Sequence, residues 1–314
     1  MPLMCMEPYL MLAAGASEDF LQPRLRQMLA QQIRGMTGSS SGPPVAFLEP
    51  AGDPGWFGPD SVTWQVHAHL VSMLVGGLSS LLIQAMHPGA LAGVWDHSSF
   101  RTDLKARLGR TAYFIAATTY GGHAMAQKAI DHVNHIHQRV TGLRPDGQPY
   151  DARDPYLLRW VHLGETLSFL KAYCTHADTS MPVFMQNQYI FEMQRIGLAL
   201  GATDLPQTLA SAEQMLLSYR TELVIDDRVR EVTNLIQNFP ARRRDRLFVK
   251  LITAAAFDLL PGWVLSDLGI ARAPAWQRKF TQQALALASV PLDWALATEG
   301  VSAHARRRLA ANQA

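Results

Sequence analysis

The sequence is short of charge and of cysteine. Of its 314 residues, 17% are Asp, Glu, Lys or Arg, whereas globular chains usually contain about 25%. The formal net charge is only +2. This argues against a nucleic-acid binder, because such proteins carry a strongly basic face. The two cysteines, Cys5 and Cys174, cannot form a disulfide framework, so a reducing compartment is expected.

Common catalytic and targeting motifs are also missing. The sequence has no GxSxG nucleophile motif, no P-loop, no HExxH motif and no paired CxxC. Residues 1–15 are apolar, but they lack a basic start and contain Glu7 and Pro8. They therefore resemble a free tail more than a signal peptide. We expect a cytoplasmic protein, which also argues against a secreted enzyme that acts on a polymer.

Residues 61–95 contain no Asp, Glu, Lys or Arg. The stretch is long enough for a membrane span, but it holds histidines, serines and paired glycines and breaks at His87-Pro88. A buried helix in a large helical protein is the better interpretation. Part of the charge deficit therefore reflects a large core.

Helical periodicity dominates the chain, and alternating strand patterns are nearly absent, so we predict an all-α fold with a single large domain. The predicted organisation is an arm over residues 1–54, a helical domain over 55–290 and a C-terminal tail over 291–314. The arm contains an amphipathic helix over 18–36 and then a Gly/Pro-rich linker. The predicted helices cover about 61–86, 101–120, 122–141, 155–175, 181–199, 207–220, 226–237, 241–258 and 273–288.

The histidines of residues 122–140 are not equivalent. One helix face carries Ala126, Ile130, Val133, His137 and Val140. His132 and His135 follow the same spacing on a polar face, so they are expected to face water while His137 faces inward. An inward histidine either fills the core with one ring nitrogen bonded to a carbonyl, or it binds a metal or haem iron.

Two arginines precede an apolar run in the helix before it. Arg107 and Thr111 are four residues apart and share a face, and Arg110 lies between them. These guanidiniums are either solvated or paired with an anion, such as a carboxylate or an acidic group of a ligand.

Other histidines also occupy suggestive positions. His87 is expected at a helix C-terminus, and His97, next to Asp96, is expected in the following turn, where it could act as an oriented base. His162 lies in an apolar helix with Glu165 three residues on; this pair is either structural or supports a site. Two arginine clusters, 242–246 and 306–308, are expected to be solvated or ion-paired and to make at most weak contact with a membrane surface.

Five segments in a fixed order resemble one known family. They are FGPDSVTW (57–64), LLIQAMHPGALAGVWDHSSF (81–100), RLGRT (107–111), HQRVTG (137–142) and DPYLLRWVH (154–162). Together with LLPGWV (259–264) they are similar to the family of latex-clearing protein (rubber oxygenase) and MpaB-type oxygenases. The resemblance covers about residues 55–270.

The resemblance implies a distantly globin-like helical fold that binds haem b. It implies that His137 is the proximal iron ligand and that Arg107, Thr111 and His162 lie near the haem. Rubber-cleaving members carry a lysine, able to bind iron, where this sequence has Arg110. A protonated guanidinium offers no lone pair, so the iron is expected to be five-coordinate or water-bound, with Arg110 free to hydrogen-bond dioxygen or a propionate.

The leading functional prediction is a haem-dependent oxygenase for a hydrophobic, unsaturated small molecule and dioxygen. His137 would hold the iron, and Arg110, His87 and His97 would set the polarity around the reacting groups. Two other classes stay open: a haem or ligand sensor or carrier without turnover, and a helical module without a cofactor.

Overall fold

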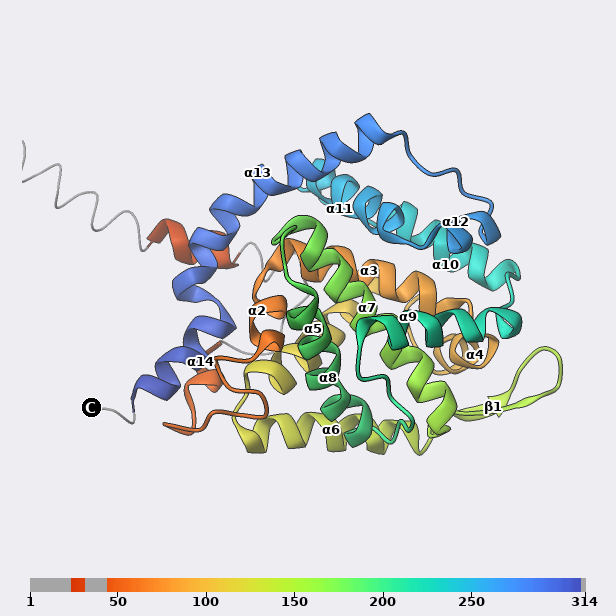
Figure 1. Ribbon diagram of the computed structural model, residues 1–314, viewed down its shortest axis with the longest axis horizontal. Helices are drawn as coiled ribbons and strands as arrows, with labels where there is room; N and C mark the ends of the chain where they lie inside the picture. Colours follow the sequence, from red (N-terminus) through yellow and green to blue (C-terminus); the bar gives the residue numbers. More distant parts are fainter. Residues whose placement is uncertain (1–23, 32–43, 312–314) are drawn as a thin grey trace, which may run out of the picture.

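Helices make up most of the part of the chain that the computed structural model describes, residues 24–31 and 44–311 (Figure 1). Residues 24–31 are helical. The two 3₁₀ helices are η1 (Pro44–Leu48) and η2 (Tyr219–Glu222), and the two strands are β1 (Thr141–Leu143) and β2 (Pro149–Asp151). The α-helices are α2 (Val62–Ala68), α3 (Leu70–Ala85), α4 (Pro88–His97), α5 (Leu104–Tyr120), α6 (His123–His137), α7 (Pro155–His176), α8 (Val183–Ala199), α9 (Leu209–Ser218), α10 (Asp227–Gln237), α11 (Arg246–Leu259), α12 (Gly262–Asp267), α13 (Ala275–Glu299) and α14 (Val301–Ala310). The all-α prediction is confirmed.

Residues 61–86 form two helices, α2 and α3, not the single helix predicted there, and the uncharged stretch then continues into α4. Helices α2 and α3 meet at an angle of 91°. The bend has a local cause: His69 adopts an extended conformation, and its Nδ1 accepts a hydrogen bond from the Ser72 backbone N–H. A side-chain acceptor of this kind satisfies a free N–H of the first turn and starts a new helix.

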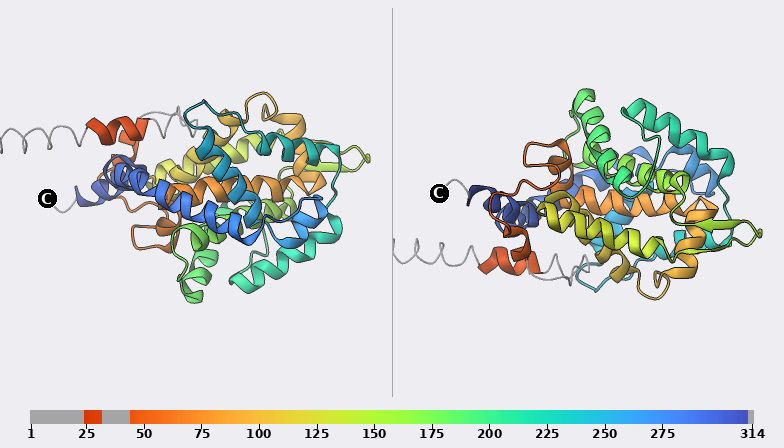
Figure 2. Two further views of the ribbon diagram at one scale, coloured as in Figure 1. Left: turned by 90° about the horizontal axis from the view of Figure 1, so that it is seen from above. Right: turned by 90° about the horizontal axis from the view of Figure 1, so that it is seen from below.

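Helix α3 runs through the middle of the molecule and packs along α7 (Figures 1 and 2). A Cβ added at Gly76 of α3 would lie 2.8 Å from Phe169 Cδ1 and 2.9 Å from the Ser168 carbonyl oxygen, both on α7. The two backbones can therefore approach this closely only because position 76 has no side chain.

Within the described residues, no single helix is both long and apolar enough to cross a membrane. Taken together, α2 and α3 have the length and composition of a membrane span, but the pair is sharply bent. Most of α3 lies in the main hydrophobic core, where Val71, Val75 and Leu82 are almost completely buried.

The segment predicted as a C-terminal tail is helical and packed over its described residues. Helix α13 continues through Pro291 to Glu299, and α14 packs against η1. Arg308 of α14 is fully buried, and its guanidinium donates to the backbone carbonyls of Phe47, Asp53 and Tyr120. Arg308 is therefore not solvated: its Nε and Nη1 join distant segments, whereas its buried Nη2 has no hydrogen-bond partner among the described residues.

The N-terminal predictions are only partly within the described residues. Residues 24–31 are helical, inside the helix predicted over 18–36, and residues 44–48 of the predicted linker form η1. The predicted tail over 1–15 lies outside the described residues.

The β1–β2 hairpin was not predicted. Its strands pair antiparallel, with Gly142 opposite Tyr150. The turn is Arg144-Pro145-Asp146-Gly147, in which Gly147 has a φ of 80° and donates to the Arg144 carbonyl. A Pro-Asp-Gly sequence is a turn pattern with a physical basis, so the sequence did contain a signal for this hairpin.

Candidate functional site

A cavity of about 280 Å³ lies among helices α3, α4, α5, α6, α7 and α10 and strand β2. This volume is close to the lower end, about 300 Å³, of small-molecule sites. Most of its lining is apolar. The polar side chains are those of Gln84, His97, Ser98, Arg107, His137 and Tyr150.

His137 ends α6 and lines this cavity. Ala126 and Ile130, on the predicted inward face of α6, are buried, whereas His132 and His135 are exposed. The helical phase therefore separated the three histidines correctly. The Nδ1 atom of His137 is buried and has no hydrogen-bond partner among the described residues.

The environment of His137 favours a neutral ring. Burial lowers its pKa below the ordinary value of 6.5, and the nearby Asp151 carboxylate opposes this shift. A neutral imidazole has one N–H and one lone pair. An unmatched buried polar atom costs about 1–3 kcal/mol, and an occupant of the cavity that bonds to the ring would remove this cost.

Arg107 is the cationic group of the cavity. Its Nη1 donates to Ser98 Oγ at 2.8 Å. Burial, and next the charge of Arg110, lower its pKa to about 10, so it stays protonated at neutral pH. Within the described part of the chain, no carboxylate lies within 4.0 Å of this guanidinium. A desolvated guanidinium of this kind matches an acidic group on a ligand.

Tyr150 on β2 joins two side chains at the cavity wall. Its hydroxyl donates to Asp96 Oδ2 at 2.6 Å and lies 3.2 Å from His97 Nε2. Burial and the Asp96 carboxylate raise the pKa of Tyr150 to about 12. A Cβ at Gly142 would lie 2.7 Å from the Tyr150 hydroxyl, so glycine at position 142 makes room for the tyrosine.

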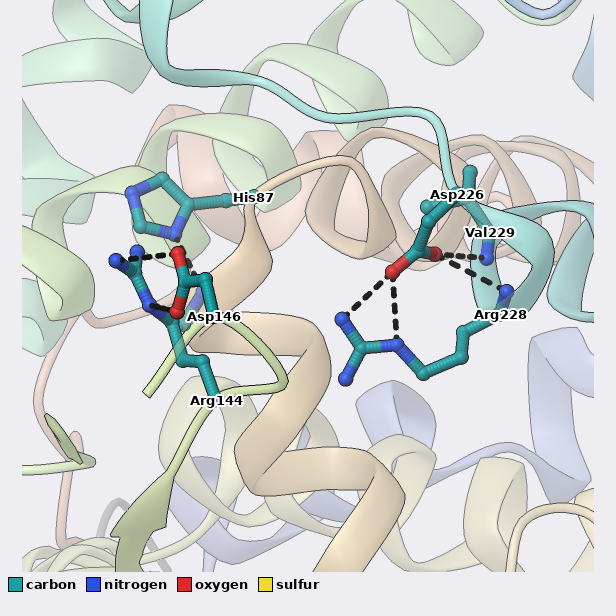
Figure 3. Close-up of polar contacts among 7 residues, drawn as sticks. His87, Arg144, Asp146, Asp226, Arg228 and Val229 are labelled. Atoms are coloured by element: carbon teal, nitrogen blue, oxygen red, sulfur yellow. Dashed lines mark hydrogen bonds and ion pairs between the residues drawn. The ribbon is translucent and has the colours of Figure 1, made fainter. Parts of the chain in front are cut away.

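Helix α10 contributes Val232, Leu235 and Ile236 to the cavity. One carboxylate, that of Asp226, caps the N-terminus of this helix. Asp226 accepts hydrogen bonds from the backbone N–H groups of Arg228 and Val229, and its other oxygen accepts two from the Arg228 side chain (Figure 3). This cap fixes where the cavity-lining helix begins.

A family model of oxygenase catalytic domains matches residues 64–289, which contain every helix and strand of the cavity wall. The family is described as ER-bound oxygenase mpaB/B'/Rubber oxygenase, catalytic domain. The chain belongs to this family. The resemblance drawn from the sequence motifs is thereby confirmed. No curated protein and no solved structure matches the chain significantly.

The structure of this family member brings together three of the residues predicted for the site: His97, Arg107 and His137 all line the cavity. His97 was expected in a turn, but it is the last residue of α4. Tyr150 was missed because its role depends on the hairpin, which places it opposite Gly142 and next to His97.

Arg110 and Thr111 do not reach the cavity. Both are exposed, and the only α5 residues in the cavity lining are Leu104 and Arg107. The Thr111 hydroxyl donates to the Arg107 carbonyl one turn earlier, a bond that threonines commonly make within helices. The predicted placement of Arg110 beside the reacting groups is therefore corrected.

His87 is also placed differently from the prediction. It precedes α4, and its Nδ1 accepts a hydrogen bond from the Gly89 backbone N–H, so it starts a helix. Its ring packs against Trp160 and Tyr219, and it lies beside the Arg144–Asp146 ion pair of the hairpin turn (Figure 3). Burial lowers its pKa. His87 is outside the cavity lining.

His162 is buried in α7, away from this cavity. Its Nε2 lies 3.4 Å from Thr166 Oγ1, and in the described structure no hydrogen bond joins it to Glu165. Burial lowers the pKa of His162 to about 4 and raises that of Glu165 to about 7. At pH 7 the buried His162 ring is therefore uncharged and the half-buried Glu165 carboxyl is about half protonated, without the direct pairing that the sequence suggested.

Proposed function

We propose that this protein is a cytoplasmic haem-b-dependent oxygenase acting on a hydrophobic, unsaturated small molecule of isoprenoid or lipid type. The observation that supports the proposal most directly is His137: a neutral imidazole with an unpartnered, buried Nδ1 in the wall of an apolar cavity. The oxygenase family to which the chain belongs supplies the class of reaction.

The donor set of the cavity suits haem better than a bare metal ion. Among residues 24–31 and 44–311, no group of three or more His, Cys, Asp or Glu side chains could hold a metal. A porphyrin brings its own four nitrogen ligands, so one histidine from the protein is sufficient. When bound, haem supplies an iron centre that activates dioxygen.

The other cavity residues would bind and orient. Arg107 carries a charge that would pair with a haem propionate or with an acidic group of the substrate. Leucine, valine and isoleucine side chains would exclude water and accept the apolar part of a substrate. The Tyr150 hydroxyl holds its proton toward Asp96 Oδ2, and this fixes the orientation of the ring at the cavity wall.

The visible spectrum of protein produced with a supply of haem tests the cofactor. We expect a Soret band in the wild type and loss of most of this band in His137→Ala. His135→Ala is the matched control, because this exposed histidine lies on the same helix and outside the cavity. A colourless wild type that cannot be reconstituted with haem would refute the proposal.

Turnover separates an oxygenase from a haem or ligand carrier built on the same cavity. We expect the haem-loaded protein to consume oxygen in the presence of unsaturated isoprenoids or lipids. A haem-bound protein that consumes no oxygen with any of them would instead be a sensor or carrier.

A further inference from the structure

Helix α13 carries an apolar stripe on its outer face. The stripe consists of Trp276, Phe280, Leu287 and Val290, whose exposed fractions are 73%, 61%, 77% and 63%. Thr281, Leu285 and Ser289 of the same helix are buried. At 3.6 residues per turn, the four exposed residues fall within an arc of about 80° centred opposite Leu285, along about 21 Å of helix. One exposed polar residue, Gln283, lies within the same arc. The stripe therefore points directly away from the core.

Basic side chains cluster at the start of the helix next to α13. Helix α11 packs against α13, and the two lie side by side when the molecule is seen from above (Figure 2, left). The start of α11 and the loop before it carry the exposed residues Arg242, Arg243, Arg244, Arg246 and Lys250, together with Leu247, which is 71% exposed. Between Ala275 and Leu292, α13 contains no acidic residue. Lys279 is exposed, whereas Arg278 lies on the core-facing side with its Nε buried.

This composition distinguishes the stripe from other exposed apolar groups. Phe184, Phe191 and Leu198 follow one face of α8, but that helix contains one basic residue, Arg195, and one acidic residue, Glu192. A second copy of the chain is a poor occupant of the α13 stripe, because a symmetric contact would bring two basic surfaces together. An exposed apolar helix face next to a helix that begins with several arginines is instead complementary to an anionic bilayer.

We propose that the α13 stripe and the basic start of α11 form a docking surface for anionic lipid bilayers. In the docked protein, α13 lies in the plane of the interface. Trp276, Phe280, Leu287 and Val290 enter the boundary between headgroups and acyl chains, and Arg242, Arg243 and Arg246 contact the lipid phosphates. None of these residues lines the cavity, so the proposal does not rest on the proposed oxygenase function.

Co-sedimentation with lipid vesicles tests the docking surface. We expect the full-length protein to bind phosphatidylcholine vesicles containing phosphatidylserine, to bind pure phosphatidylcholine much less, and to lose binding at high salt. Each basic residue near an anionic surface contributes about fivefold to binding, so Arg242→Gln/Arg243→Gln should bind at least tenfold more weakly. Trp276→Ser/Phe280→Ser should lose a similar amount.

The matched control is Phe184→Ser/Phe191→Ser, which removes exposed aromatic residues from α8 and should leave vesicle binding unchanged. Circular dichroism establishes that each variant is folded, and haem content provides a second check that the cavity is intact. The proposal is overturned if the wild type ignores anionic vesicles or if the α8 and α13 variants lose binding equally. It is also overturned if ultracentrifugation finds a dimer that the α13 substitutions dissociate.

Discussion

Glu165 on α7 is a half-buried acidic side chain, and desolvation raises the pKa of its carboxyl to about 7 from an ordinary 4.5. In the folded protein this carboxyl binds its proton more tightly than in the unfolded chain. Its contribution to folding stability is therefore complete below pH 4.5 and is lost as the pH rises through 7.

Replacement of this residue gives a pH-dependent effect. We expect Glu165→Gln to raise the free energy of unfolding at pH 8 by about 1–3 kcal/mol, because the variant has no carboxylate to desolvate. The gain should shrink toward pH 4.5, where the wild-type carboxyl is protonated. Urea unfolding at pH 4.5, 7 and 8 measures it, and a gain that is the same at all three values would contradict this account.

For single residues, the sequence predicted the orientation of a side chain correctly where that orientation depends on the phase of one helix. The phase of α6 predicted that His137 faces inward and that His132 and His135 face water. Arg110 and Thr111 lie in the exposed part of α5, outside the cavity. Residues of α4 and α10 complete the cavity wall, and the sequence around Arg110 does not reveal where that wall ends. The Tyr150–Asp96 hydrogen bond joins residues 54 positions apart and could not be read from local pattern.

At the scale of elements, the contact between α3 and α7 depends on one of two adjacent glycines. A Cβ at Gly76 would lie within 3.0 Å of backbone and side-chain atoms of α7, whereas a Cβ at Gly77 would meet only Phe169 Cε1, at 3.9 Å. Both residues have the same intrinsic helix propensity, but only position 77 has space for a side chain.

Alanine substitutions at these two glycines should therefore have opposite effects. We expect Gly76→Ala to lower the free energy of unfolding by about 2 kcal/mol or more, because the helices must move apart. Gly77→Ala should be neutral or raise it by up to about 1 kcal/mol, because alanine favours a helix. Guanidinium unfolding of both variants provides the comparison, and equal destabilisation would show that backbone proximity is not the cause.

Most helices were predictable because their apolar periodicity is strong and their ends carry recognisable caps, as at Asp154-Pro155 of α7. The bend at His69 was not predictable from the sequence, because residues 61–86 are apolar on both sides of it. The histidine caps α3 through its ring nitrogen, which is not a usual capping group. The hairpin was missed for a different reason: its strands have three residues each, too few for a period to emerge.

At the scale of the whole molecule, Arg308 joins segments that are far apart in sequence. Its guanidinium satisfies carbonyls of η1, of the following loop and of the end of α5. A small second hydrophobic cluster, formed by Phe47, Trp64, Tyr120 and Ala305, lies in the same region. This region lies partly outside residues 64–289, which match the family.

Loss of the Arg308 guanidinium should weaken the whole fold. Arg308→Met would leave three carbonyls without this donor, and we expect the free energy of unfolding to fall by about 3 kcal/mol or more. Arg243→Gln, at an exposed arginine, is the control and should change it by less than about 0.5 kcal/mol. Thermal unfolding measures both variants, and similar melting temperatures for Arg308→Met and the wild type would rule out this role.

The position of Arg308 also determines the order in which the fold can be completed during translation. The carbonyls of Phe47, Asp53 and Tyr120 leave the ribosome long before the side chain that satisfies them, because Arg308 is made 188 residues after Tyr120. Helices α3 and α7 and all residues that line the cavity also precede Arg308 in the chain. The hydrogen bonds of Arg308 with η1, with the loop after it and with the end of α5 can therefore form only after α14 has been synthesised.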